Sequence, residues 1–204
     1  MINMVSFYCW IFGYICGSIP SAYLIVKAIS KTDIRQYASG NVGSTNALRV
    51  LGPKGGALTL LGDIAKSILA LALPAYLGAG RYLFYAAGLG AIIGHNWSIF
   101  LKFKGGKGVA VSVSVLTLLQ PIAGIISILL FALIVWTTNY VSLGSILMAM
   151  SWPILLFLFK QPMSEVYFAL LLFIMIVIQH RGNIHRLISG TERKTSLKKT
   201  ENIE

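Results

Sequence analysis

The segment Ile122-Ala123-Gly124-Ile125-Ile126-Ser127-Ile128-Leu129-Leu130-Phe131-Ala132-Leu133-Ile134-Val135-Trp136 carries no charge and one hydroxyl group. Further mainly apolar runs cover 57–77, 82–93, 141–159 and 166–178. Of the 204 residues, 56% are hydrophobic and only 11% are charged, and the mean hydropathy is +0.78. One water-soluble core of this size cannot bury all these runs. The sequence therefore predicts an all-α protein that crosses a membrane several times.

Glycine, proline and charged residues divide the chain into expected spans near 3–29, 56–77, 82–97, 108–119, 121–137, 141–159 and 163–180. The fourth span is the shortest. Its rise of about 18 Å falls short of a hydrocarbon core of roughly 30 Å. We expect a short or re-entrant helix there that turns at Gln120-Pro121. The alternative is one long kinked helix over 108–137.

The basic residues behind the net charge of +11 lie mainly between the apolar runs. With seven spans and the N-terminus outside, most of the 17 Lys and Arg fall on one side, in 27–54, 102–107 and 181–199, and the other side has Arg81 and Lys160. Cytoplasmic loops are enriched in Lys and Arg, so this distribution favours seven spans and a cytoplasmic C-terminus. It also favours anionic lipid headgroups or phosphate substrates, rather than nucleic acid, as partners.

No internal repeat and no linker divides the sequence. We expect one transmembrane domain over 1–190 and a cytoplasmic tail over 191–204.

The first polar segment is Ser39-Gly40-Asn41-Val42-Gly43-Ser44-Thr45-Asn46-Ala47-Leu48-Arg49. Its glycines allow tight turns that present backbone N–H groups to an anion, and its hydroxyl and amide side chains add donors. An arginine can bind phosphate through two N–H groups. The segment is typical of a phosphate-binding loop, and an ordinary polar loop is the alternative.

The second polar segment is Phe103-Lys104-Gly105-Gly106-Lys107-Gly108-Val109. It places two ammonium groups around a glycine turn directly before an expected helix, whose N-terminus favours anions. It is not a Walker A loop, because Leu101 and Gly108 stand where that motif needs Gly and Ser or Thr. A basic loop that serves only membrane topology is the alternative.

The third polar segment begins with His180-Arg181-Gly182-Asn183 and continues to Glu192. A purely topological anchor needs Arg and Lys, but it does not need His180 or Asn183 at the end of an apolar span. Polar side chains at that depth indicate function, with helix capping as the alternative. We expect Glu192 to neutralise a neighbouring arginine rather than to react.

Other candidates fit structural roles better. His95 lacks the aspartate partner of a base dyad, because the required position holds Phe100, and a structural hydrogen bond is the simpler interpretation. Asp63 and Lys66 lie three apart on one helix face, where they are expected to form an ion pair, with a proton relay as the alternative. The segment Ser18-Ile19-Pro20-Ser21 is expected to kink the first span and to line a cavity.

Taken in order, these motifs resemble those of the PlsY family of acyl-phosphate:glycerol-3-phosphate acyltransferases. The resemblance covers 13–194, and the stretches that carry it are Gly17–Pro20, Ser39–Arg49, Gly94-His95, Phe103–Ala110 and His180–Glu192. Two positions depart from the family pattern: Ser44 and Ser21 stand where Ala and Phe are more usual.

The resemblance implies a bacterial inner-membrane enzyme with seven helices, an outside N-terminus and a cytoplasmic active site. Such an enzyme transfers a fatty acyl group from acyl phosphate to glycerol 3-phosphate, giving lysophosphatidic acid and phosphate, early in phospholipid synthesis. It works without an Asp-His base, which agrees with Phe100. A soluble enzyme that makes acyl phosphate is the implied functional partner. We expect no metal ion and no cofactor.

The resemblance also implies roles for individual residues. Ser39, Arg49 and Lys107 would hold glycerol phosphate, and the segment 40–46, Lys104, His180 and Asn183 would contact acyl phosphate. The expected catalytic residues are Ser39, Arg49, Lys104, Lys107, His180 and Asn183. Further substrate contacts are expected from Gly40, Asn41, Gly43, Ser44, Thr45, Asn46, Gly105, Gly106 and His95.

Two other classes compete with an enzyme. A transporter or channel for an organic phosphate would also place basic, glycine-rich segments in a membrane bundle, but the sequence lacks repeated halves and gathers its polar motifs on one expected face. A non-catalytic scaffold leaves the hydroxyl, lysine and histidine clusters unexplained.

Overall fold

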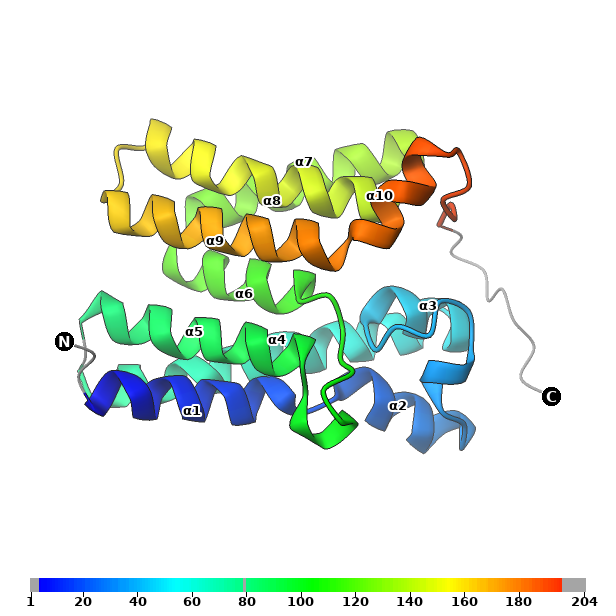
Figure 1. The fold of residues 1–204 in the computed structure, drawn as a ribbon, viewed down its shortest axis with the longest axis horizontal. Coiled ribbons are helices and arrows are strands. Elements are labelled where there is room, and N and C mark those ends of the chain that lie inside the picture. The colour runs from blue at the N-terminus through cyan, green and yellow to red at the C-terminus, as the bar shows by residue number, and fades with distance from the viewer. Residues whose placement is uncertain (1–3, 79, 196–204) are drawn as a thin grey trace. The chain divides into compact units, whose positions relative to one another are not determined.

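The computed structural model describes residues 4–78 and 80–195. Every expected span contains a helix (Figure 1). The first holds two helices, and the others hold one each, with bounds close to the predicted ones. The helices in these spans are α1 Met4–Ser18, α2 Ser21–Ser30, α4 Pro53–Tyr76, α5 Arg81–Asn96, α6 Val109–Leu119, α7 Pro121–Thr138, α8 Val141–Leu158 and α9 Met163–Gln179.

Two short helices occupy segments that the hydropathy pattern leaves as polar loops: α3 over Ser44–Leu51 and α10 over Arg181–Ile188. In α3 the buried residues are Asn46, Ala47 and Val50, which share one face of the helix. Burial of this face stabilises a helix whose composition is too polar to reveal it. Two single 3-10 turns, η1 Ile34–Gln36 and η2 Ile99–Leu101, complete the described elements.

Within the described ranges, four helical segments are long and apolar enough to cross a membrane by length and composition. They are Met4–Ser30, which comprises α1 and α2, and the single helices α4, α7 and α8. The pair α9 and α10, bent by 64°, would make a fifth, and α6 is shorter. The all-α, polytopic fold class is confirmed, whereas seven crossings and the orientation of the termini stay predictions.

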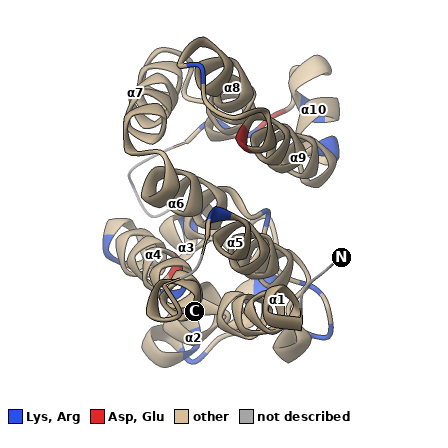
Figure 2. Cartoon of the chain, turned by 90° about the vertical axis from the view of Figure 1, so that its left-hand side faces the viewer, with Lys and Arg blue, Asp and Glu red and all other residues tan. Residues whose placement is uncertain are grey.

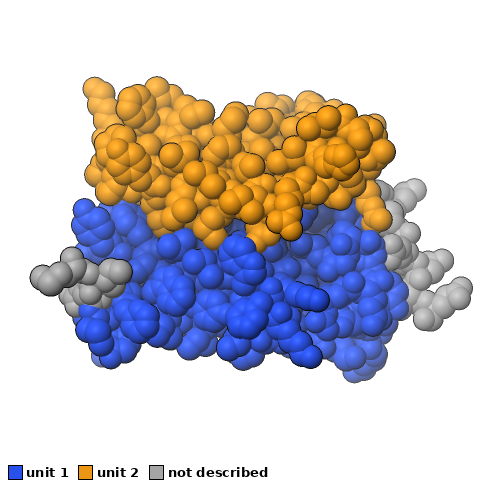
Figure 3. Space-filling model, in the orientation of Figure 1, with its two compact units in different colours: residues 1–115, 196–204 blue, residues 116–195 orange. Residues whose placement is uncertain are grey.

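The described residues divide into two compact units, 4–78 with 80–115 and 116–195 (Figure 3). The boundary falls inside α6. The expected single domain over 1–190 stays a prediction.

In the first unit, α1 and α5 pack through glycines on both helices. A Cβ atom at Gly13 or Gly17 would collide with the α5 backbone at Ala87 or Ala91. In the other direction, a Cβ atom at Gly90 would collide with the α1 backbone. Small residues four apart let membrane helices approach this closely, because the gain is van der Waals contact rather than the hydrophobic effect. The close contact fixes α5, which ends in the motif Gly94-His95.

Pro20 separates α1 from α2, as the sequence predicts, because proline has no N–H and blocks a continuous helix. The break exposes carbonyl groups that need new donors. The Ser98 hydroxyl donates to the Ser18 carbonyl at 2.6 Å, and the Lys66 ammonium group donates to the Ile19 carbonyl at 2.9 Å. The break is therefore joined to α4 and to the segment after α5.

In the second unit, α6 and α7 meet at Gln120 and fold back on each other. A Cβ atom at Gly124 would collide with Thr117, and this contact is impossible in a continuous helix, where residues seven apart are about 10 Å apart. Gln120 donates to Gln161 at 3.1 Å and also to Glu165 near the start of α9. The alternative of one long helix over 108–137 is therefore wrong.

The helices α1, α7 and α8 contain no charged residue (Figure 2). Large apolar side chains such as Leu129, Leu133 and Trp136 of α7 are exposed. A stripe of exposed apolar side chains is favourable in contact with lipid but not in contact with water. Trp152 of α8, by contrast, is fully buried within the second unit.

Candidate active site

The loop at the start of the first motif is held by one amide side chain. Asn46 is buried, its Nδ2 donates to the carbonyls of Ile34 and Tyr37 at 3.2 Å each, and its Oδ1 accepts from the Ser39 N–H at 3.1 Å. Asn46 thereby ties η1 and the start of the motif to α3. Its side chain is occupied by the loop, so its effect on a ligand acts through the position of Ser39.

The rest of the motif leads into α3. Gly40 has a φ of 67°, a left-handed conformation that glycine adopts without strain, and its N–H donates to the Tyr37 carbonyl at 2.9 Å. Gly43 is the N-cap residue of α3, and the first N–H groups of a helix have no partner within it. Ser39 is exposed, and Asn41, Ser44, Thr45 and Arg49 are partly exposed. Hydroxyl and amide donors thus stand beside the N-terminus of α3, and Arg49 lies in the last turn of the same helix.

A small apolar core packs against the first motif. It comprises Ala22, Val26, Ile34, Val42, Ala47, Val50 and Leu101. Because Val42 and Ala47 belong to the first motif and Leu101 lies two residues before the second, the same core anchors both.

The second motif forms a tight turn between η2 and α6. The N–H groups of Gly105 and Gly106 donate to the carbonyls of Asn96 and His95 at 3.1 and 3.0 Å. Gly108 has a φ of 78°, and α6 begins at the next residue. Lys104 is exposed and Lys107 is partly exposed. Two cationic side chains therefore flank a turn that is fixed to the end of α5.

The two motifs meet at Gly106. A Cβ atom there would lie 2.9 Å from the Val42 carbonyl oxygen and would collide with His95 Nε2. Only glycine fits between these groups. The first unit thus brings Ser39–Arg49 and Lys104–Lys107 together around one junction.

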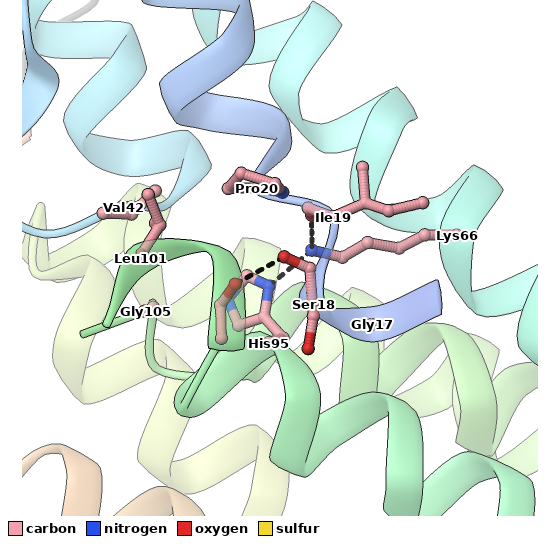
Figure 4. Close-up of a pocket in the computed structure, with 11 residues that line it drawn as sticks. Gly17, Ser18, Ile19, Pro20, Val42, Lys66, His95, Leu101 and Gly105 are labelled. Atoms are coloured by element: carbon pink, nitrogen blue, oxygen red, sulfur yellow. Dashed lines mark hydrogen bonds between the residues drawn. The ribbon is translucent and has the colours of Figure 1, made fainter. Parts of the chain in front are cut away.

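A small cavity lies at this junction, and Figure 4 shows the side chains around it. Its lining comprises Gly17, Ser18, Ile19, Pro20, Val42, Lys66, His95, Ser98, Leu101, Gly105 and Gly106. Ser18 and Pro20 line it as predicted, whereas Ser21 does not; Ser21 instead packs near Gly62 of α4.

Buried charges border the cavity. Lys66 Nζ lies 2.9 Å from Asp63 Oδ1, which confirms the predicted ion pair. Lys66 Nζ also lies 2.9 Å from His95 Nδ1 (Figure 4). The side chains of Asp63, Lys66 and His95 are only 2%, 3% and 6% exposed. His95 is thus part of a buried network, which agrees with the structural role expected from its sequence context.

The third motif lies in the second unit. His180 is buried at the junction of α9 and α10, and its Nδ1–H donates to the Ile176 carbonyl at 2.8 Å. Asn183 is buried on α10, and its Nδ2 donates to Glu192 Oε1 at 2.6 Å. Both side chains are oriented by contacts within their own unit.

Glu192 is the centre of that arrangement. It accepts hydrogen bonds from Asn183, from the Ser142 hydroxyl at 2.8 Å and from Arg186 Nε at 2.7 Å. Burial disfavours the charged carboxylate, but these hydrogen bonds outweigh burial, so the pKa of Glu192 lies below its ordinary value of 4.5. The expected neutralisation of an arginine is confirmed. The first residues of the expected tail are anchored, and 196–204 lie outside the described residues.

The predicted site residues therefore form two groups, one in each unit. Sequence reasoning missed the links from His95 to Lys66 and from Glu192 to Ser142. These pairs are separated by 29 and 50 residues, and no local pattern connects them.

Comparison with known proteins decides the family. A family profile described as "Glycerol-3-phosphate acyltransferase" matches residues 7–190. The chain belongs to this family. The glycerol-3-phosphate acyltransferase of Thermoanaerobacter pseudethanolicus is 41% identical over 188 residues, covering 92% of this chain and 94% of the relative.

Solved structures agree with the family assignment. The crystal structure of PlsY (YgiH), an integral membrane glycerol 3-phosphate acyltransferase, in its glycerol 3-phosphate form has a TM-score of 0.87 and 33% identity. The match covers 94% of this chain and 96% of the chain in that structure. The lysophosphatidic acid form has a TM-score of 0.84 and 32% identity, with the same coverage. As a member of this family, the chain is an integral membrane acyltransferase of phospholipid synthesis.

Proposed function

We propose that this acyltransferase moves a fatty acyl group from acyl phosphate to glycerol 3-phosphate. The glycerol hydroxyl oxygen attacks the acyl carbonyl carbon, and the bond between that carbon and the phosphate oxygen breaks. The products are lysophosphatidic acid and phosphate. In net terms, the hydroxyl proton ends on the released phosphate.

The junction at Gly106 is the observation that carries this proposal. It joins a turn flanked by Lys104 and Lys107 to a segment whose donors include Ser39 and Arg49. Two phosphorylated reactants repel each other, and cationic side chains with backbone N–H groups offset that repulsion. Glycerol 3-phosphate is proposed to bind to Ser39, Arg49 and Lys107. Acyl phosphate is proposed to bind to Lys104 and the loop 40–46. His180 and Asn183 are proposed to serve the same reaction.

The acidic residues support a mechanism without a carboxylate base. In the described part of the chain every acid has a polar partner: Asp33 pairs with Arg35, Asp63 with Lys66, Glu165 with Gln120 and Glu192 with Arg186. Acyl phosphate is an activated donor, so alignment and stabilisation of the developing charge are the main tasks of the protein.

We further propose a bacterial inner-membrane location with the site facing the cytoplasm. An acyl chain then enters from lipid while glycerol 3-phosphate arrives from water. The donor would come from a soluble enzyme that makes acyl phosphate.

The test separates an enzyme from a transporter of organic phosphate. Purified protein in proteoliposomes receives labelled glycerol 3-phosphate with and without acyl phosphate. We expect labelled lysophosphatidic acid only when acyl phosphate is present, and no accumulation of free label inside the vesicles. Uptake of unmodified glycerol 3-phosphate without product would contradict the proposal.

A further inference from the structure

The ammonium group of Lys66 contacts three groups, each 2.9 Å from Lys66 Nζ. It donates a hydrogen bond to the Ile19 carbonyl oxygen, forms an ion pair with Asp63 Oδ1, and shares a hydrogen bond with His95 Nδ1. A lysine ammonium group has three N–H donors and no acceptor. His95 Nδ1 must therefore accept, so a neutral His95 ring carries its proton on Nε2.

The other edge of the same ring faces the glycine turn. His95 Nε2 occupies the space that a Cβ atom of Gly106 would need, and the His95 carbonyl accepts the Gly106 N–H at 3.0 Å. Both the ring and the backbone of His95 thus contact Gly106. A rotation of the ring would move the turn or open a void beneath it.

The network links elements that are far apart in the sequence. Lys66 lies on α4, the Ile19 carbonyl at the break between α1 and α2, and His95 at the end of α5. Asp63 compensates the charge of Lys66 one helical turn away. An apolar side chain at position 66 would fill the space, but it would give neither His95 nor Ile19 a donor.

We propose that Asp63 and Lys66 are positioning residues for the acyl transfer: they hold His95 as the Nε2–H tautomer and thereby set the position of the Gly105-Gly106 turn. This inference rests on the proposed function for its kinetic consequence. The tautomer itself follows from the contacts of Lys66 alone.

The experiment compares Lys66→Met with the double variant Asp63→Asn/Lys66→Met. The single variant leaves a buried carboxylate without its cation, which strongly destabilises a fold. The double variant removes both charges and should restore thermal stability in detergent. If the pair were only structural, the double variant would also restore activity.

We expect the double variant to fold but to lose kcat/KM for glycerol 3-phosphate on the order of 100-fold, since small misplacement of binding groups has effects of that size. Most of the loss should be a higher KM for glycerol 3-phosphate, because the turn carries Lys107. Lys54→Met, an exposed lysine on the same helix, is the matched control and should keep wild-type kinetics.

Imidazole nitrogen-15 NMR gives an independent readout. In the wild-type protein the His95 spectrum should show an unprotonated Nδ1 and a protonated Nε2, and this pattern should change in the double variant. A folded double variant with wild-type kinetics and an unchanged His95 spectrum would overturn the inference. If wild-type protein transferred no acyl group, the proposed function would fail, while the spectrum would still test the tautomer.

Discussion

Asn183 Nδ2 lies 2.6 Å from Glu192 Oε1, and this hydrogen bond joins α10 to the segment that follows it. Glu192 also accepts from Ser142 on α8. One carboxylate therefore fixes an expected catalytic side chain to two parts of the second unit. The side chain of Glu192 is only 5% exposed, so water cannot replace these contacts readily.

Glu192→Gln should destabilise the protein by about 2 kcal/mol, because hydrogen bonds to a buried charged group contribute about that much. The lowered Tm can be measured by thermal unfolding in detergent. Asp33→Asn is the control, since the ion pair of Asp33 with Arg35 is more exposed and such pairs contribute about 1 kcal/mol or less. Equal Tm losses in the two variants would contradict the role given to Glu192.

Stability should fall in acid in a way that depends on Glu192. Its pKa is lower in the folded protein than in the unfolded chain, so its contribution is fully present above pH 4.5 and is lost as the pH falls through the lower folded pKa. The decrease in Tm below pH 4.5 should be smaller in Glu192→Gln than in wild type. Asp33, whose pKa is lowered mainly by its hydrogen bond from Arg35, contributes a decrease of the same sign. Parallel Tm curves for wild type and Glu192→Gln would show that Glu192 does not contribute.

Gly106→Ala should lower kcat/KM on the order of 100-fold, because the new methyl group displaces His95 or Val42 and misaligns the turn. Steady-state kinetics in detergent measure the loss. Gly80→Ala is the control, because a Cβ atom at Gly80 meets open space and its φ of −65° suits alanine. Undiminished turnover in Gly106→Ala would place the site elsewhere.

Arg49→Lys keeps a positive charge but loses the planar pair of donors that fits a phosphate. We expect kcat/KM for glycerol 3-phosphate to fall by about tenfold or more, corresponding to the loss of one hydrogen bond to a charged group. The measurement is made at low glycerol 3-phosphate concentration, where weaker binding lowers the rate directly. Wild-type turnover under that condition would remove Arg49 from the site.

Local chemistry explains why much of the fold was predictable. Long apolar runs give the positions of α4, α7 and α8, and Pro20 and Pro121 mark breaks because proline interrupts the helical hydrogen-bond pattern. The expected topology places the donor-rich segments at Ser39–Arg49 and Lys104–Lys107 on one membrane face, and the structure brings these two segments together in the first unit.

Other features depend on contacts that local patterns do not contain. The helix α3 buries one face, and α10 buries Asn183, which donates to Glu192. Neither helix has the length or apolarity of a span. Lys66 finds its partner at His95 only because α1, α4 and α5 pack together. Glu192 reaches Ser142 through the return of the chain to the start of α8. These contacts set how the side chains are oriented, and the residue types alone do not reveal that orientation.

The choice of acyl donor tests the account most directly. Purified protein is given labelled glycerol 3-phosphate with acyl phosphate, acyl-CoA or acyl carrier protein as separate donors, and lysophosphatidic acid and phosphate are measured. We predict lysophosphatidic acid from acyl phosphate alone, with one phosphate released for each acyl group transferred. Equal or faster transfer from acyl-CoA or acyl carrier protein would contradict it.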